Sequence, residues 1–125
     1  MELTKDFQEM AFFAKKYGID KFIDNIDHTF LNIQKYRAGE VIIGNKKKME
    51  KIFFLVSGKI KILTLQENGK RVLIRFSTPL NILGDLEFLS DYPIETQVEA
   101  VTDVIFITIN QDEARRKLYN DSDFL

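Results

Sequence analysis

The residues best suited to chemistry lie in the stretch 82–100, ILGDLEFLSDYPIETQVEA. An apolar run ends there at Gly84-Asp85, and the pattern predicts one short helical turn followed by a strand over residues 96–100. A glycine lets the backbone approach a ligand closely, because it carries no Cβ. Backbone N–H groups at the start of a short helix attract anions. The stretch therefore predicts a binding site for a small anionic ligand.

Catalytic and metal-binding sites find little support in the chain. It contains one histidine, His28, and no cysteine, which excludes a thiolate metal site and the cluster of histidines in a jelly-roll metalloenzyme. No serine lies in a Gly-x-Ser-x-Gly elbow. Carboxylates at positions 85, 87, 91 and 95 could do acid–base work, but a solvated acidic loop is the simpler interpretation. We expect no enzyme, no metal and no other cofactor.

Composition bounds the class of protein. The 125 residues are 45% hydrophobic and 30% charged, with a net charge of −1, which is typical of one soluble domain without a strongly basic surface. No apolar run approaches the ~20 residues that span a bilayer. The N-terminus, MELTKDFQEM, carries acids where a signal peptide has a basic region. We expect a cytoplasmic protein that does not contact a membrane.

Residues 1–28 show the spacing of helices. We expect a first helix that is capped by Thr4 and ended by Gly18, and a second that runs from a cap at Asp20 to Ile26. The apolar face of the first helix would comprise Leu3, Phe7, Met10, Ala11 and Ala14.

From residue 29 the pattern changes to that of short strands, and a β-roll is expected over 29–110. Strands are predicted at 30–36, 41–43, 52–56, 59–65, 72–76, 80–83, 96–100 and 104–109. Asn68-Gly69 predicts a hairpin turn, and residues 111–125 begin a C-terminal helix. The fold class is mainly β with flanking helices, a single jelly-roll (double-stranded β-helix) domain over 1–125. Its core is expected to include Phe53, Leu55, Ile60, Ile62, Val72 and Ile74.

The strand series resembles one known family of β-rolls. The run FFLVSG at 53–58, the Asn68-Gly69 turn, the step ILGDL at 82–86 and the VEA at 98–100 follow each other as in the cyclic-nucleotide-binding-domain superfamily. More narrowly, they resemble the sensor domain of bacterial Crp/Fnr-type transcription regulators. The resemblance covers about residues 29–125, and it implies a ligand-binding cassette at 84–96 with contacts from Gly84, Asp85, Leu86, Glu95 and Thr96.

The cassette departs from the family pattern at its two polar contacts. The resemblance implies a glutamate for the ribose, and Asp85 holds that place with one methylene fewer. It also implies an arginine for the phosphate, but that place holds Ile94 or Glu95, depending on the direction of counting. A phosphodiester would lose a charge-assisted bidentate contact and meet like charge. We expect weak or absent binding of cyclic AMP and cyclic GMP.

Arg75 is the one charge inside the apolar run 72–76, which faces the cassette in the fold of the family. It could supply the missing cation to an anionic ligand. Alternatively it points to water at a strand edge, or pairs with Glu95 or Asp85. We favour this second interpretation, because lone charges in half-buried strands point outward by default.

Two functions are compatible with this sequence. The first is the effector domain of a Crp/Fnr-like regulator that senses a small anion. The alternative is a stand-alone protein-interaction β-roll with no small ligand. DNA would be bound only through a helix-turn-helix module that this chain lacks. Residues 123–125 lie where a long dimerisation helix would begin in the family, so we expect a sensor fragment or a natural short form. The parent protein would be a homodimer, and this chain a monomer or weak dimer.

Overall fold

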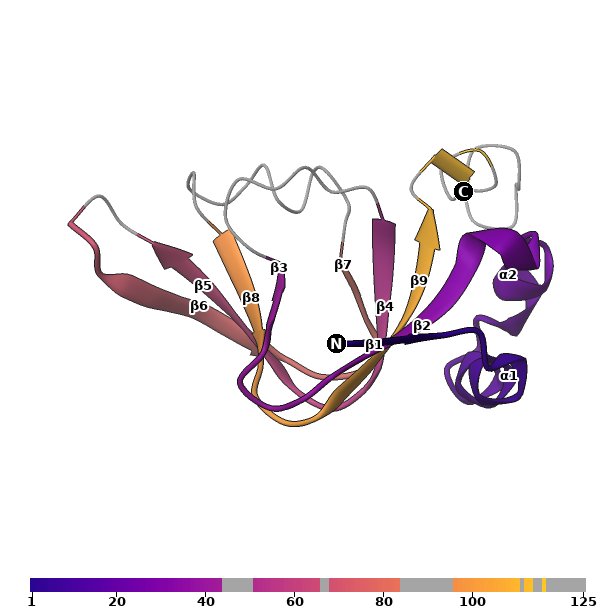
Figure 1. The fold of residues 1–125 in the computed structure, drawn as a ribbon, viewed down its shortest axis with the longest axis horizontal. Helices are drawn as coiled ribbons and strands as arrows, with labels where there is room; N and C mark the ends of the chain where they lie inside the picture. The colour runs from indigo at the N-terminus through magenta and orange to yellow at the C-terminus, as the bar shows by residue number, and fades with distance from the viewer. Residues whose placement is uncertain (44–50, 66–67, 84–95, 111, 114–115, 117–125) are drawn as a thin grey trace.

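The computed structural model describes residues 1–43, 51–65, 68–83, 96–110, 112–113 and 116. Short strands dominate the described residues, as Figure 1 shows. In chain order the elements are β1 (Glu2–Thr4), α1 (Phe7–Lys16), α2 (Asp20–Asp24), the 3-10 turn η1 (His28–Phe30), β2 (Leu31–Tyr36), β3 (Val41–Ile43), β4 (Lys51–Ser57), β5 (Ile60–Leu65), β6 (Arg71–Ser77), β7 (Asn81–Leu83), β8 (Thr96–Ala100) and β9 (Val104–Asn110).

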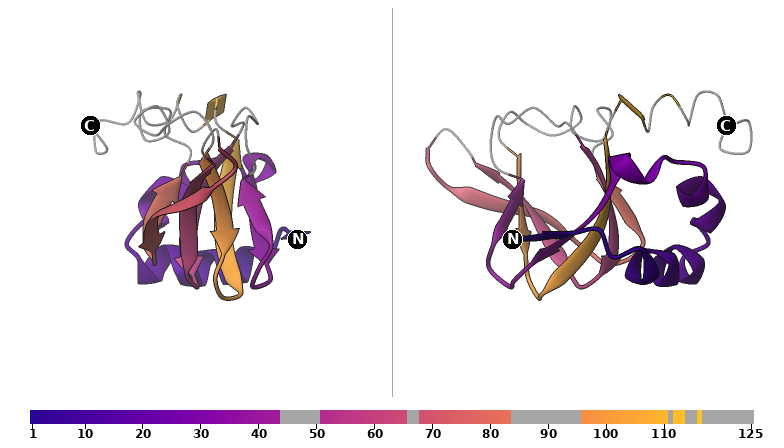
Figure 2. Two further views of the ribbon diagram at one scale, coloured as in Figure 1. Left: turned by 90° about the vertical axis from the view of Figure 1, so that its left-hand side faces the viewer. Right: turned by 45° about the vertical axis from the view of Figure 1, so that its right-hand side comes forward.

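The strands form two antiparallel sheets, which confirms the predicted jelly-roll class. Sheet A has the order β1-β2-β9-β4-β7, and sheet B has the order β3-β8-β5-β6. The chain passes from one sheet to the other several times, so neighbours in space are often distant in sequence. The two sheets meet at one end and diverge at the other, where β5 and β7 end and β8 begins (Figures 1 and 2). We call this second end the open end of the roll.

Two apolar cores hold the sheets and helices together. The inner core lies between sheets A and B, and the outer core lies between sheet A and the helices α1 and α2. Strand β4 contributes to both cores because its side chains alternate between the two faces of sheet A. Phe53 and Leu55 face the inner core, and Ile52, Phe54 and Val56 face the outer one. This explains why residues 52–56 are a continuous apolar run.

The first residues of the chain depart from the helical prediction. Thr4 ends strand β1, which pairs with β2, and Leu3 is exposed in that strand instead of facing a helix core. The cap of α1 is Asp6, whose carboxylate accepts bonds from the N–H groups of Gln8 and Glu9 at 3.1 Å. A carboxylate at this position satisfies two free N–H groups of the first turn, and pairing with β2 draws residues 2–4 into sheet A.

The second helix also begins differently. Ile19 occupies the cap position without a side-chain bond, and Asp20 is the first helical residue. Of the predicted face of α1, Met10 and Ala14 are buried, whereas Phe7 is exposed and stacks on the ring of His28 at 4.5 Å. His28 thus lies on the surface of η1, as expected for a capping or surface histidine.

The predicted inner core is confirmed except at one position. Phe53, Leu55, Ile60 and Ile62 are buried, and Ile74 packs against them. Val72 was expected in the core but is 40% exposed. Its strand, β6, is the edge of sheet B and pairs only with β5 among the described strands. Val72 lies opposite Thr64 on this edge strand, so among the described strands it has a neighbour on one side only.

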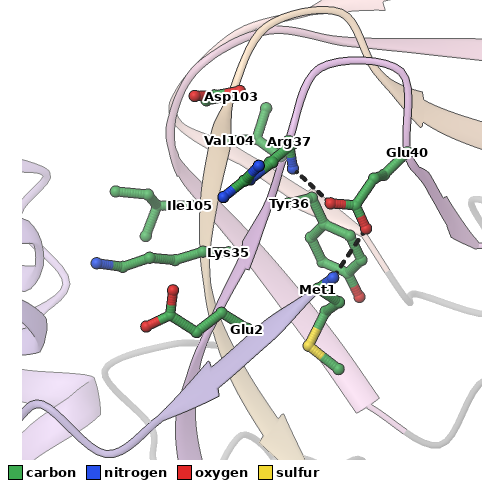
Figure 3. Close-up of a pocket in the computed structure, with 9 residues that line it drawn as sticks. All are labelled: Met1, Glu2, Lys35, Tyr36, Arg37, Glu40, Asp103, Val104 and Ile105. Carbon is green, nitrogen blue, oxygen red and sulfur yellow. Dashed lines mark hydrogen bonds and ion pairs between the residues drawn. The ribbon is translucent and has the colours of Figure 1, made fainter.

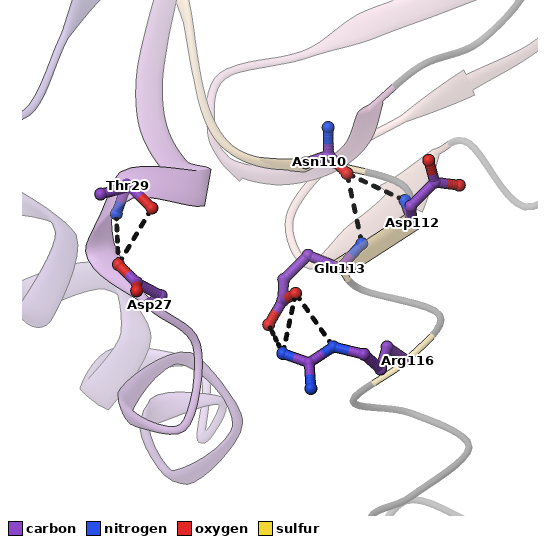
Figure 4. A network of polar contacts seen from close by, with 6 residues as sticks. All are labelled: Asp27, Thr29, Asn110, Asp112, Glu113 and Arg116. Atoms are coloured by element: carbon purple, nitrogen blue, oxygen red, sulfur yellow. Dashed lines mark hydrogen bonds and ion pairs between the residues drawn. The ribbon is translucent and has the colours of Figure 1, made fainter.

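The C-terminal helix was predicted from Gln111-Asp112, and most of it lies outside the described residues. Its first turn is described in part. Asn110 Oδ1 accepts bonds from the N–H groups of Asp112 and Glu113, at 3.0 and 3.2 Å (Figure 4). The Glu113 carboxylate is buried and receives the Arg116 guanidinium at 2.8 to 3.2 Å. Asn110 therefore caps this turn directly at the end of β9.

Candidate functional site

The predicted cassette lies in the chain between the end of β7 and the start of β8. Gly84, Asp85, Leu86 and Glu95 lie outside the described residues, so the structure places only the ends of the segment that contains them. Residue 83 ends β7 in sheet A, and Thr96 begins β8 in sheet B. Leu83 and Thr96, the two described residues that flank the rest of the predicted cassette, therefore belong to different sheets.

One described polar residue, Thr64, follows the apolar residues on the inner face of sheet B. Thr64 lies between Val72 on β6 and Thr96 on β8 in the strand register. Directly opposed residues in antiparallel strands share a face of the sheet, and Thr64 follows the core residues Ile60 and Ile62 at the strand period. Thr64 Oγ1 is buried and has no hydrogen-bond partner in the part of the chain that the structure describes. A buried hydroxyl without a partner is unusual and marks a place where a ligand or water can bind.

Arg75 lies at an irregularity of the β5–β6 pair. Leu63 opposes Leu73, whereas Ile62 opposes Arg75, so Ile74 is an extra residue in β6. Such a bulge interrupts the regular alternation of side chains. The register therefore sets Arg75 opposite a core residue, although its side chain is exposed to solvent. The exposure of Arg75 agrees with the interpretation that it points to water, and its role toward a ligand stays a prediction.

A separate pocket of about 500 Å³ lies at the opposite end of the roll, around the turn that joins β2 to β3 (Figure 3). Glu40 organises this turn. Its carboxylate accepts a bond from the Arg37 N–H at 2.9 Å and pairs with the N-terminal ammonium group at 2.8 Å. The pocket is lined by Met1, Glu2, Lys35, Tyr36, Arg37, Glu40, Asp103, Val104 and Ile105.

The charged groups of this pocket mainly bind backbone groups of the neighbouring turns and so stabilise those turns. The ammonium group, followed by the Arg37 N–H, lowers the pKa of the Glu40 carboxyl from its usual 4.5. Asp103 accepts the Ala38 N–H at 2.9 Å, and burial followed by the Glu40 charge raises the pKa of Tyr36. We assign these groups a structural role in the two turns at this end. No group of three potential metal-ligating side chains gathers among the described residues.

The sequence profile of the cyclic nucleotide-binding domain family matches residues 33–121. The chain belongs to this family. The match spans the whole roll from β2 to the segment after β9, which confirms the superfamily resemblance read from the strand series. No curated protein sequence matches the chain. Among the described residues, no helix is long and apolar enough to cross a membrane.

Solved structures of this family share the fold at low sequence identity. A regulatory subunit of a cAMP-independent protein kinase A from Trypanosoma brucei superposes with a TM-score of 0.67 and 18% identity, over 88% of this chain and 43% of that one. The sensor domain of the transcriptional regulator DNR from Pseudomonas aeruginosa gives 0.64 and 16%, over 75% and 63%. The catabolite activator protein of Thermus thermophilus gives 0.62 and 14%, over 74% and 43%. The chain thus spans less than half of the length of that activator.

Sequence reasoning identified Arg75 but missed Thr64. The signal for Thr64 was present, because the alternation of lysine and isoleucine over residues 59–62 sets position 64 on the isoleucine face. A threonine in that series predicts a polar group at the end of an apolar face. The bulge at Ile74 carries no comparable signal in the sequence, since neither glycine nor proline marks it.

Proposed function

We propose that this domain is the ligand-sensing regulatory domain of a Crp/Fnr-like transcription regulator in the cytoplasm. Its ligand is a small anion that binds at the open end, between the segment 84–96 and the inner face of sheet B. The domain has no catalytic role. Binding acts by a difference in affinity between two conformations of the parent protein, which contacts DNA through another module.

The register of sheet B carries this proposal. It aligns Arg75 with the core residue Ile62, and it sets the buried hydroxyl of Thr64 one step nearer to the open end. An exposed cation and a buried hydroxyl are thus aligned with neighbouring positions of β5, toward the end of sheet B at which the predicted cassette rejoins the described chain. This pair suits a carboxylate or phosphate group, because a guanidinium recognises both in bidentate geometry.

The residues of the cassette itself argue against a cyclic nucleotide that is bound as in the rest of the family. The place of the phosphate-binding arginine holds Ile94 or Glu95, and Asp85 is shorter than the glutamate that the family uses for the ribose. Arg75 would approach the ligand from β6, outside the cassette. We therefore infer an anion of another shape, with Gly84, Asp85, Leu86, Glu95 and Thr96 forming the rest of its site.

The test is a thermal-shift screen of the 125-residue chain with cyclic AMP, cyclic GMP and a panel of small carboxylates and phosphates. A ligand at a hundred times its dissociation constant adds about 2.7 kcal/mol of stability, which a shift of the melting temperature reports. We expect a stabilising anion among the non-cyclic compounds, and dissociation constants near 1 mM or weaker for both cyclic nucleotides, about −4 kcal/mol.

Two arginines of β6 provide a matched control. Arg75→Ala should remove the stabilisation by the anion, whereas Arg71→Ala should keep it, because Arg71 opposes Leu65 and pairs with Glu99 at 3.7 Å. Micromolar binding of either cyclic nucleotide in calorimetry would contradict the inferred ligand class. Equal effects of the two substitutions would contradict the role of Arg75.

A further inference from the structure

The outer face of sheet B is the one broad sheet surface that no described element covers. Helices α1 and α2 cover the outer face of sheet A, whereas Figure 1 shows sheet B without a helix on its outer side. The strand register orders this outer face in rows. The first row runs from Val41 on β3 through Glu99 on β8 and Lys61 on β5 to Phe76 on β6. The next row contains Gln97, Leu63 and Leu73.

Large apolar side chains stand exposed on these rows. Phe76 is 50% exposed, Leu73 44% and Val41 48%. Leu63, which opposes Leu73, is buried and is not part of the inner core. Leu73 and Phe76 lie in adjacent rows on β6, whereas Val41 lies on β3 beyond Lys61 and Glu99. Single exposed apolar residues are ordinary, but neighbouring ones on one sheet face can mark an interaction surface.

The charges that surround this surface are mainly positive. Lys59 lies over the ring of Phe76, with its Nζ 4.4 Å from the ring centroid. Lys61 and Arg71 share Glu99, the one carboxylate among the described residues of these rows, at 3.9 and 3.7 Å. Three cations against one carboxylate leave an excess of two positive charges, in a chain whose net charge is −1. The surface is therefore complementary to an acidic partner.

We propose that the outer face of sheet B binds an acidic amphipathic helix of a partner protein. Apolar side chains of that helix would cover Leu73 and Phe76, and its carboxylates would meet Lys59 and Arg71. Four strands at ~4.8 Å spacing make a face about 14 Å wide, which accommodates one helix of ~10 Å diameter. Helices already cover the outer face of sheet A in this way. This inference does not depend on the ligand proposed above.

Two other occupants fit the surface less well. A strand added to the edge of β6 would meet the bulge at Ile74, which disturbs the ladder and protects edges from pairing. A second copy of this chain would bring its own Lys59, Lys61 and Arg71 against the same cations, and like charges in an interface are repulsive. Charge and backbone geometry therefore both favour an acidic helix.

The test uses the full chain and three fluorescent peptides of about 18 residues, or five helical turns. The first carries leucines on one face and glutamates beside them, the second has lysines in place of the glutamates, and the third has the composition of the first in scrambled order. We expect the acidic amphipathic peptide to bind at least tenfold more tightly than the other two in fluorescence anisotropy, a difference of about 1.4 kcal/mol. Its affinity should fall as salt is added.

Substitutions on the outer face of sheet B and on helix α1 test where the peptide binds. The double variant Leu73→Ser/Phe76→Ser, and separately Lys59→Glu, should each weaken the acidic peptide at least tenfold. Phe12→Ser should not, since Phe12 is exposed on α1, on the other side of the molecule. All three replace exposed or half-exposed side chains, so folding is retained and circular dichroism checks it.

Three results would overturn this proposal. The first is equal binding of the acidic and basic peptides. The second is binding of single-stranded DNA that matches the acidic peptide and survives the Leu73→Ser/Phe76→Ser change, which would indicate a plain polyanion surface. The third is a dimer that this double variant dissociates, which would assign the face to a second copy of the chain.

Discussion

Gly58 lies so close to Val104 that no side chain fits between them. A Cβ built on Gly58 would stand 2.9 Å from Val104 Cα and 2.6 Å from Val104 Cγ1, and it would clash with the Asp103 carbonyl oxygen. Gly58 also has a φ of +93°, a conformation that L side chains rarely adopt. The Ser-Gly step after β4 is thus required by a close contact between the β4–β5 turn and the start of β9.

Gly58→Ala should therefore destabilise the fold by about 2–6 kcal/mol, because backbone strain and overpacking each cost about 1–3 kcal/mol. Gly39→Ala is the matched control, since Gly39 has a φ of +89° but open space around its Cα. It should cost only the strain, about 1–3 kcal/mol. Urea denaturation measures both values. Equal losses would show that the contact with Val104 relaxes without cost.

Leu55→Ala should cost on the order of 2–5 kcal/mol, because Leu55 is fully buried in the inner core and its removal leaves a cavity. Val72→Ala should cost less than about 1 kcal/mol, because Val72 is half-exposed at the open end. Denaturant midpoints of the two variants compare these positions directly. A loss at residue 72 that matches the loss at residue 55 would contradict the exposed position of β6.

The sequence predicted the central strands of the two sheets better than the edge strands β1 and β6. Residues 52–56 are a continuous apolar run because both faces of their strand are buried, and residues 96–100 alternate polar and apolar side chains with Val98 and Ala100 buried. Both patterns are typical of strands. Residues 2–4 could not be assigned to β1, since a three-residue strand has no period of its own and is stabilised by its partner β2. The prediction that Val72 is buried was wrong for a related reason. An alternating pattern tells which face a residue takes, but it does not tell that the strand lies at the edge of its sheet, as β6 does.

Thr64→Val should stabilise the ligand-free domain by about 1 kcal/mol, because it removes a buried hydroxyl that has no partner among the described residues. If Thr64 contacts the anionic ligand, the same substitution weakens ligand binding while it raises the melting temperature. Thermal denaturation with and without the anion separates the two effects. A Thr64→Val variant that is less stable than the wild type would show that the hydroxyl is satisfied in solution, for example by water.

The turn around Glu40 should make stability sensitive to acid. The pKa of the Glu40 carboxyl is lower in the folded chain than its usual 4.5, so the unfolded chain binds its proton first. The contribution of Glu40 is therefore fully present above pH 4.5 and is lost as the pH falls below that value through the lowered pKa. Glu40→Gln should flatten this part of the stability–pH curve. Chemical denaturation at several pH values between about 3 and 6 measures it, and an unchanged slope in the variant would contradict the assignment.

The 125-residue chain should be a monomer or a weak dimer at micromolar concentration. Stable specific interfaces bury ~1,200–2,000 Å² in total. The large exposed apolar residues of α1 are Phe7 and Phe12. Phe7 is already stacked on His28, and Phe13 packs against the outer core. Two such side chains per copy provide much less area than this range. Light scattering of the wild type and of Phe12→Ser should give the same mass. A tight dimer that Phe12→Ser dissociates would instead place the interface on α1.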